Sequence, residues 1–476
     1  MFLNIYEFCA GTSEYNTIRA TFSGEELCKG LQGRLEANLE DYVSKDLGAI
    51  TPINTLGKLN FETLYFVGLG ERKELTTAKL RTVFGELAKM MEKDFVLHAE
   101  SFATETIPGT TVAQIFVESY IMARYVFKKY RADRKENAEL TVRIFTADDA
   151  SAAIEKGTVY GEATNHARDL SNEPSNKLIP ADIATYAQQL AKDLNLECEV
   201  LANSQLKELG AGALLAVNRG SRHEARMITI KYQGLPTWEN PTALVGKGIT
   251  FDTGGYSLKP PTGMVGMKHD MSGAANVLGA IEAIARLGLK ANVMAVIAST
   301  ENMVSDYAMK VDDVITSLAG KTIEVNNTDA EGRLILADAV TYAQQQGATR
   351  IVDIATLTGA CLVALGTDIS GVVSNNDSFY NDFVKAAAAT DEKQWRLPTD
   401  QWFVDQVRSS KVADLLNGPT RFGGASIAAA FIGEFIEVKD WIHLDIAGTG
   451  NVDKDTALCP YGATGVFVRA MAELFA

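Results

Sequence analysis

The sequence lacks the features that mark membrane, secreted and disulfide-stabilised proteins. Among its 476 residues, no apolar run approaches the roughly 18 residues that a membrane span needs. The first 18 residues contain no Lys or Arg, so the basic segment that opens a secretory signal is missing. The five cysteines form no CxxC pair and no even framework, which predicts reduced thiols. We therefore expect a soluble, cytoplasmic protein.

Basic charge and histidine are also scarce. The chain has 45 Lys and Arg against 60 Asp and Glu, a net charge of -15 that opposes non-specific binding to nucleic acid or to an anionic membrane. Neither HExxH nor a His/Cys cluster is present, which excludes a mononuclear zinc protease of the HExxH type. We expect a structural role for each scattered histidine, namely His98, His166, His223, His269 and His443.

The length and composition indicate a globular protein with more than one domain. A chain about three times the ~150 residues of a typical domain, with 46% apolar and 22% charged residues, can bury a large core. A helix over about 148–170 is expected to end in the polar segment SNEPSN at 171–176. We predict an N-terminal domain at 1–155, a linker helix at 156–176 and a second domain at 177–476.

Strand and helix patterns alternate on both sides of this junction, which is typical of the α/β class. Apolar runs predict strands at 62–68, 140–146, 227–232, 243–249, 292–299, 322–325 and 350–355. Helical spacing predicts helices after Thr76-Thr77 and at 112–129, 274–287 and 333–346, with the two threonines as caps. Such sheets bind ligands beyond the carboxyl ends of their strands, where the polar motifs of the second half fall.

The first motif is VGKGITFDTGGYSLKP at 245–260. It is not a phosphate loop, because Gly248 rather than Ser or Thr follows the lysine and Pro241 stands where the first glycine belongs. It is not a dinucleotide fingerprint either, because Phe251 replaces the third glycine. The plain alternative is a strand followed by a Gly-rich turn with solvated lysines.

The second motif is MKHDM at 267–271, followed by the small residues of a helix start at 272–275. An aspartate before a helix is most often a cap or a first-turn charge, so Asp270 has a structural alternative. In an extended chain His269 would point away from Asp270 and need not share its site.

The third motif is NNTDAEGRL at 326–334, between a strand and a helix. Thr328 and Glu331 match a capping box, which is its structural alternative. A capping box does not require Asp329 and Arg333. In an extended chain Asp329, Glu331 and Arg333 share one face, which indicates a charged site.

The three motifs together supply four carboxylates and three basic side chains. These residues are Asp252, Asp270, Asp329 and Glu331, with Lys247, Lys259 and Arg333. Four crowded carboxylates repel one another and take up protons unless cations lie between them. Two divalent ions would offset the charge, and carboxylate ligands favour Mg, Mn, Co or Zn.

The three segments resemble the signature segments of the leucine aminopeptidase (cytosol aminopeptidase) family. The similarity continues through ARDLSNEPSN (167–176), DIATLTGACLVALG (353–366), WRLP (395–398), NGPTRFGGASIAAAF (417–431) and HLDIAGTG (443–450). It covers roughly residues 160–476, whereas the first 150 residues match only through YFVGLG (65–70). One departure is SRHEARMI (221–228), where relatives usually carry a proline-rich segment.

The resemblance implies a macrodomain-like N-terminal α/β domain and a catalytic α/β domain with a mixed, largely parallel sheet flanked by helices. It implies a homohexamer and two metal ions per subunit. Lys247, Asp252, Asp270 and Glu331 would hold the tighter ion. Asp252, Asp329 and Glu331 would hold the more exchangeable one.

The resemblance also assigns the remaining roles. Lys259 and Arg333 would be catalytic, with Arg333 holding a bicarbonate ion. The residues placed against the substrate are Lys247, Asp252, Lys259, Met267, Asp270, Asp329, Thr356, Leu357 and Ala447. Small residues around Ala447 and Gly450 favour apolar N-terminal side chains of medium size.

The sequence therefore predicts a metal-dependent aminopeptidase that releases apolar N-terminal residues such as leucine, with Mn or Zn preferred over Co or Mg. Carboxylate-held metal pairs also serve phosphate esters, so a two-metal phosphoesterase is the alternative within the same chemistry. A DNA-binding regulator is an alternative of another class, and the negative charge argues against it.

Overall fold

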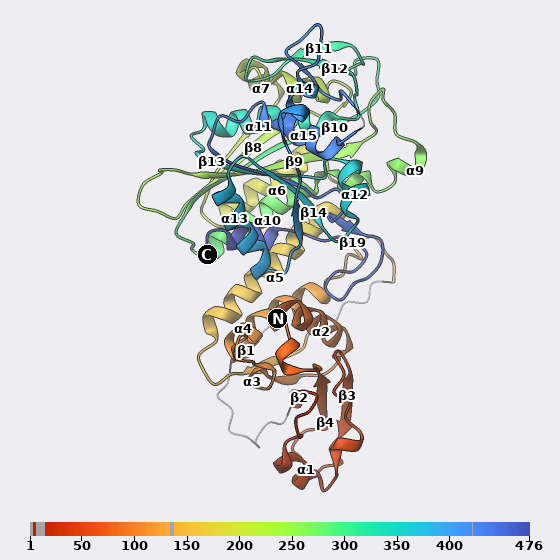
Figure 1. Ribbon diagram of the computed structural model, residues 1–476, viewed down its shortest axis with the longest axis vertical. Coiled ribbons are helices and arrows are strands. Elements are labelled where there is room, and N and C mark those ends of the chain that lie inside the picture. Colours follow the sequence, from red (N-terminus) through yellow and green to blue (C-terminus); the bar gives the residue numbers. More distant parts are fainter. Residues whose placement is uncertain (1–2, 6–14, 134–137, 421) are drawn as a thin grey trace. The chain divides into compact units, whose positions relative to one another are not determined.

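The computed structural model describes residues 3–5, 15–133, 138–420 and 422–476, and the chain forms two compact units (Figure 1). The first unit comprises Met1–Glu162 and Lys454–Pro460, and the second comprises Ala163–Asp453 and Tyr461–Ala476. The division falls inside helix α5 (Ser151–Asn172), which begins three residues later than the sequence predicts and ends two residues later. None of the described helices combines the length and apolar character that a bilayer crossing needs.

The first unit contains a six-stranded sheet in the order β1-β6-β5-β2-β4-β3, parallel except between β3 and β4. Helices α2 (Thr77–Met90) and α4 (Gly109–Ala123) pack on the face that carries Ile18 and Val67. Leu64 and Phe66 point to the opposite face, where α1 (Lys29–Leu35) lies. The strands are β1 (Leu3–Ile5), β2 (Asn16–Thr21), β3 (Ile50–Asn54), β4 (Thr63–Gly68), β5 (Phe95–His98) and β6 (Val142–Phe145).

Most predictions for this unit are confirmed, and one helix is misplaced. Strands β4 and β6 lie within their predicted ranges, and the Thr76 side chain caps α2 by accepting a hydrogen bond from the Lys79 amide. The helix predicted at 112–129 begins at Gly109 and ends at Ala123. It ends where the Arg124 guanidinium donates hydrogen bonds to the carbonyls of Ala88 and Met91.

The second unit is built on an eight-stranded mixed sheet in the order β15-β14-β17-β13-β9-β10-β8-β7. The four central strands, β17, β13, β9 and β10, run parallel to one another. Strand β14 pairs antiparallel with β17, β8 pairs antiparallel with β10, and β7 pairs antiparallel with β8. The strands are β7 (Glu197–Leu201), β8 (Arg226–Gln233), β9 (Thr242–Asp252), β10 (Asn292–Asn302), β13 (Arg350–Ala355), β14 (Ser370–Ser374), β15 (Gln394–Arg396) and β17 (Asp440–Asp445).

Helices cover both faces of this sheet (Figure 1). Val245 points into the core beneath α11 (Glu331–Gln345), while the next residue, Gly246, faces α10 (Ser272–Arg286). The remaining helices of this unit include α6 (Pro180–Asp193), α8 (Gly212–Asn218), α13 (Asp377–Ala389), α15 (Gly424–Gly433) and α16 (Val468–Glu473). The fold is therefore the predicted two-domain α/β architecture.

Glycine brings the start of α10 unusually close to β9 and β13. A Cβ atom on Gly246 would lie 2.7 Å from the Ala274 Cα, and one on Gly273 would lie 2.2 Å from the Ile354 carbonyl oxygen. Larger side chains would push the helix off the strand, which explains the small residues at its start. This close packing holds the short 3-10 helix η3 (Met267–Met271) beside the middle of β9.

Candidate active site and metal centre

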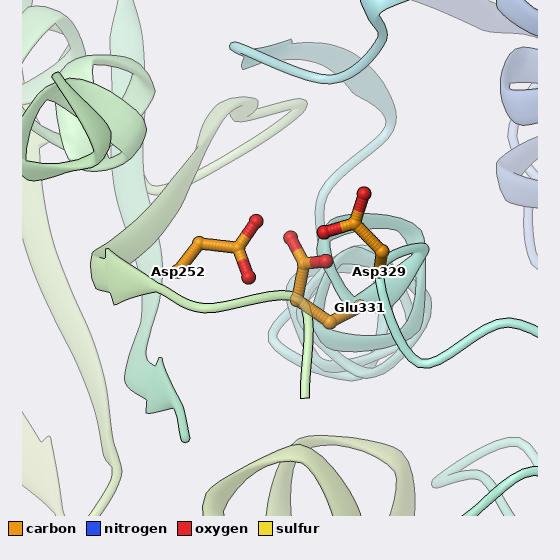
Figure 2. A group of neighbouring side chains, drawn as sticks. All are labelled: Asp252, Asp329 and Glu331. Atoms are coloured by element: carbon orange, nitrogen blue, oxygen red, sulfur yellow. The ribbon is translucent and has the colours of Figure 1, made fainter. Parts of the chain in front are cut away.

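The carboxylates of the three motifs converge at the carboxyl ends of the central strands. Asp252 ends β9, Asp270 lies in η3, Asp329 lies two residues before α11, and Glu331 is the first residue of that helix. In Figure 2 the side chains of Asp252, Asp329 and Glu331 point toward one another, and each offers an oxygen within 4.8 Å of the others. The arrangement is a ready-made set of hard oxygen ligands.

Two lysines each join a pair of these carboxylates. The Lys247 Nζ lies 2.9 Å from Asp270 Oδ1 and 2.9 Å from Glu331 Oε1. The Lys259 Nζ lies 2.7 Å from Asp252 Oδ2 and 2.5 Å from Asp329 Oδ1. Lys247 also donates a hydrogen bond of 3.1 Å to the Thr356 carbonyl. The ammonium groups thus partly neutralise the cluster.

Burial and mutual repulsion make full ionisation of the four carboxylates unfavourable. Burial, reinforced by the charge of Asp252, raises the pKa of Asp270, Asp329 and Glu331. Burial alone would lower the pKa of Lys247, but the Asp270 and Glu331 carboxylates more than offset it and raise that pKa. Additional cations would let all four carboxylates ionise.

Two carboxylate oxygens are available to such cations. Asp270 Oδ2 and Glu331 Oε2 are buried and have no hydrogen-bond partner within the part of the chain that the structure describes. A buried carboxylate oxygen without a partner is costly unless a cation or water satisfies it. The donor set, its burial and these two oxygens therefore fit a divalent metal centre.

Arg333 lies next to this cluster and is buried. Its Nη1 donates a 2.6 Å hydrogen bond to the Asn417 carbonyl, while its Nε has no hydrogen-bond partner among the described residues. Burial lowers the pKa of Arg333 to about 10, against the opposing effect of Glu331 and Asp445. The guanidinium stays charged at neutral pH and keeps donor capacity for an anion.

All the residues that the sequence analysis assigned to the site line one cavity of about 520 Å³. Met267, Thr356, Leu357 and Ala447 line it together with the charged cluster. The Thr356 hydroxyl donates a 2.8 Å hydrogen bond to Asp270 Oδ1, which joins the two groups. The cavity has room for a small peptide end beside the carboxylates.

The structural alternatives for the second and third motifs are wrong. The Thr328 hydroxyl donates to the Gly254 carbonyl and accepts from the Ser257 amide, so it does not cap α11. The residue before α10 is Met271, and Asp270 faces Lys247 instead of capping the helix. Tertiary partners at the carboxyl ends of the strands have replaced these local contacts.

Two expectations that assumed extended chain are also wrong. Glu331 and Arg333 belong to α11, so they share the site through the first helical turn and not through strand alternation. His269 lies in η3 and lines the same cavity as Asp270, although an extended chain would separate them.

The turn from β9 into the site requires glycine, since Gly254 and Gly255 have φ of 85° and 61°.

Sequence reasoning missed the side chains that hold the site in place. The Asp445 carboxylate, at the end of β17, accepts hydrogen bonds from the Leu357 amide at 3.2 Å, the Ala447 amide at 3.1 Å and the Thr358 hydroxyl at 2.6 Å. It therefore ties together the two loops that contribute Leu357 and Ala447 to the cavity. Asp445 lies at the end of β17 and two residues before Ala447, and this position was the one sequence signal that it belongs to the site.

Asn302 was missed as well. Its side-chain amide donates to Asp252 Oδ1 at 2.8 Å and to the Thr328 carbonyl at 3.0 Å. The Gly254 amide also donates to Asp252 Oδ1 at 2.8 Å. These two donors orient Asp252 and leave its other oxygen facing Lys259.

Fold and site together define an α/β protein whose carboxylate cluster fits a divalent metal centre. The catalytic domain of the cytosol aminopeptidase family matches residues 165–472, and the N-terminal domain of the same family matches residues 18–134. The chain belongs to this family and is a metal-dependent aminopeptidase, a hydrolase that acts on peptides.

Two solved structures resemble the whole chain. One is the bottromycin maturation enzyme BotP, 32% identical, with a TM-score of 0.86 over 96% of this chain and 98% of that chain. The other is the same enzyme in complex with Mn, 31% identical, with a TM-score of 0.87 over 97% of this chain and 99% of that chain. The similarity covers both units.

Proposed function

We propose that this chain hydrolyses the N-terminal peptide bond of peptides at a centre of two divalent ions and favours apolar N-terminal residues such as leucine. The observation that carries the proposal is the cluster of four carboxylates beside a cavity of about 520 Å³, in which the buried Asp270 and Glu331 each keep one oxygen without a hydrogen-bond partner among the described residues. An ion such as Mg²⁺ is usually bound through one or two carboxylates, so four converging carboxylates suit two ions better than one.

We assign the ligands from the family resemblance, and the convergence of the carboxylates supports this assignment. Lys247, Asp252, Asp270 and Glu331 would hold the tighter ion, and Asp252, Asp329 and Glu331 would hold the more exchangeable one. Bound divalent ions lower the pKa of a water molecule and polarise a scissile carbonyl. The complex of BotP with Mn supports Mn as one of the ions, and Zn, Co and Mg suit the same oxygen ligands.

Lys259 and Arg333 supply the remaining charges. The Asp252, Glu331 and Asp329 carboxylates more than offset the effect of burial on Lys259 and raise its pKa, so its ammonium stays charged. That ammonium would face the oxyanion that develops on the substrate carbonyl. The Arg333 Nε has no hydrogen-bond partner among the described residues and can donate to an anion, and we assign it the bicarbonate ion that would accept a proton from the attacking water.

The walls of the cavity select the end of the peptide. Met267, Thr356 and Ala447 would contact the N-terminal side chain, and Leu357 would offer its backbone carbonyl to the substrate. The free α-amine of the substrate, when neutral, can approach the carboxylate-held ions, which favours release of single N-terminal residues. We further propose that the enzyme is cytoplasmic and assembles as a homohexamer.

The test is hydrolysis of a leucyl anilide by the purified protein before and after chelation. We expect chelation to abolish activity and added Mn or Zn to restore it. An N-terminal amino-acid library assayed with each metal would define the preferred residue, and an aryl phosphate serves as the control substrate. Turnover of the aryl phosphate without turnover of the anilide would contradict the proposal.

A further inference from the structure

A second cavity, of about 220 Å³, lies in the N-terminal unit on the face of the sheet that α1 covers. Thr17 and Arg19 of β2 lie on this face, and Leu64 of β4 is the register partner of Thr17. Helix α1 and the segment 59–61 form the cover. This volume is far more than the ~10–15 Å³ that one water needs, so the space suits a small molecule.

Two arginines line this cavity, and no described carboxylate neutralises them. The Arg19 guanidinium lies 3.4 Å from His98 Nδ1, and no ion pair of Arg19 or Arg34 exists among the described residues. Burial and the charge of Arg19 lower the pKa of His98 to about 4, so the ring is neutral at physiological pH and Nδ1 acts as acceptor. No described Asp or Glu lines the cavity either.

Such an uncompensated charge is notable in a chain whose net charge is -15. Arg19 is only partly exposed, and burial lowers its pKa, so its charge is incompletely hydrated. An anion held by the guanidinium groups would form charge-assisted hydrogen bonds in a partly dry site. The cavity is therefore selective for negative charge.

The rest of the lining is mostly apolar. Leu31, Leu59, Phe61 and Leu64 contribute walls from α1, the 59–61 segment and β4. A ligand must therefore combine an anionic end with an apolar body. A free amino acid is disfavoured, because nothing acidic in the described lining would bind its ammonium group.

We propose that this cavity binds a small organic oxyanion, a carboxylate or a phosphate monoester that carries an apolar or aromatic group. Arg19 and Arg34 hold the oxyanion, and the apolar walls hold the body. Arg34 is exposed, so it lies on the solvent side, while Arg19 lies deeper against the sheet. The site belongs to the N-terminal unit and does not depend on the function proposed for the metal centre.

Isothermal titration of the metal-loaded full chain tests the proposal with two matched pairs of probes. The pairs are 4-phenylbutyrate with 4-phenylbutan-1-ol, and phenyl phosphate with phenol. We expect at least one anion to bind, and its neutral counterpart to bind at least about tenfold more weakly, as the loss of a hydrogen bond to a charged group implies. The better anion identifies the preferred oxyanion. The absence of binding by both anions at millimolar concentration would overturn the proposal.

Variants assign the binding to this cavity and not to the metal centre. Arg19→Gln and Arg34→Gln should each weaken the bound anion about tenfold or more and leave leucyl anilide hydrolysis unchanged. Lys29→Gln removes a charge from the same helix outside the cavity and should leave the affinity unchanged. Because Arg34 is exposed, Arg34→Gln should fold normally, and it tests the proposal even if Arg19→Gln unfolds. Wild-type affinity in Arg34→Gln would overturn the proposal.

Discussion

The first motif contains two lysines, Lys247 and Lys259, that have the same side chain but different surroundings. Lys247 is buried between Asp270 and Glu331, whereas Lys259 is partly exposed between Asp252 and Asp329. A lysine can ligate a metal only as the neutral amine, and arginine cannot become neutral in a protein. The same substitution should therefore have different effects at the two positions.

We expect Lys247→Arg to lose the tighter metal and nearly all activity, because a fixed positive charge would stand where the ligand belongs. Lys259→Arg should keep both metals and some turnover, since its task is to present charge to an oxyanion. Lys259→Ala should lower kcat on the order of 10²–10³, as for other lost oxyanion donors. Metal analysis of the purified variants checks this. Equal metal retention in the two arginine variants would show that the lysine ligand is wrongly assigned.

Asp445 is expected to position the substrate loops without touching the metals. Asp445→Asn keeps the size of the side chain but turns one of the acceptors for the Leu357, Thr358 and Ala447 groups into a donor. We expect a rise in KM of about tenfold or more, with both metals retained. Steady-state kinetics and metal content measured on the same sample decide the matter. Loss of metal together with activity would instead place Asp445 in the metal centre.

The charged residues of the site could be predicted from the sequence, but their supports could not. The motifs place Asp252 at the end of a strand and Asp329 and Glu331 between the strand at 322–325 and α11, and the three carboxylates meet in the structure. The hydrogen bonds of Asn302 with Asp252 and of Asp445 with the Leu357 amide join residues 50 and 88 positions apart. Local spacing can place Asp445 at a strand end, but it does not reveal these contacts. Such side chains are recognised only when the strand order is known.

The first turn of α11 must leave room for the Lys247 side chain. A Cβ atom on Gly332 would lie 2.7 Å from the Lys247 Nζ and 2.8 Å from its Cε. We expect Gly332→Ala to displace the amine, lower the metal content and reduce leucyl anilide hydrolysis at least tenfold, although alanine favours helix.

Gly33→Ala is the matched control, because Gly33 lies in α1 and a Cβ there would meet nothing within 4 Å. Its metal content and activity should equal those of the wild type. Normal metal content in Gly332→Ala would show that the helix can shift without cost and that the close approach to Lys247 is not required.

Most elements could be predicted because their apolar pattern is local. Strands β12 (Thr322–Val325) and β13 match their predicted ranges, and α10 and α11 begin within two residues of theirs. Strand β9 runs on to Asp252 because it keeps pairing with β10 as far as Asn302. Periodicity does not report such pairing, so the sequence predicted a turn where the strand continues.

At the scale of the whole molecule, the family resemblance predicts a hexamer. Six chains of 51.5 kDa have a mass of about 300 kDa, and closed symmetric assemblies are common among soluble oligomers. Light scattering on the purified, active protein should give this mass. A monodisperse active monomer would contradict the hexamer and leave the chemistry of the site intact.

The division of the chain into units includes one feature that sequence patterns did not predict. Residues 454–460, close to the C-terminus, belong to the N-terminal unit. Gly85 of α2 allows their approach, since a Cβ there would lie 2.4 Å from the Ala457 carbonyl oxygen. A short segment without periodicity does not indicate which domain it packs on. The long helix α5 at the junction could be predicted from its sequence pattern.

We propose that Asp252 and Glu331 would each ligate both divalent ions, which would activate the water that cleaves the N-terminal peptide bond. The most direct test measures metal per subunit and leucyl anilide hydrolysis together in the wild type and in Glu331→Ala. We predict two ions per subunit in the active wild type, and loss of both bound metal and activity in Glu331→Ala. Hydrolysis of the leucyl anilide by Glu331→Ala at the wild-type rate would show that Glu331 is not a required metal ligand.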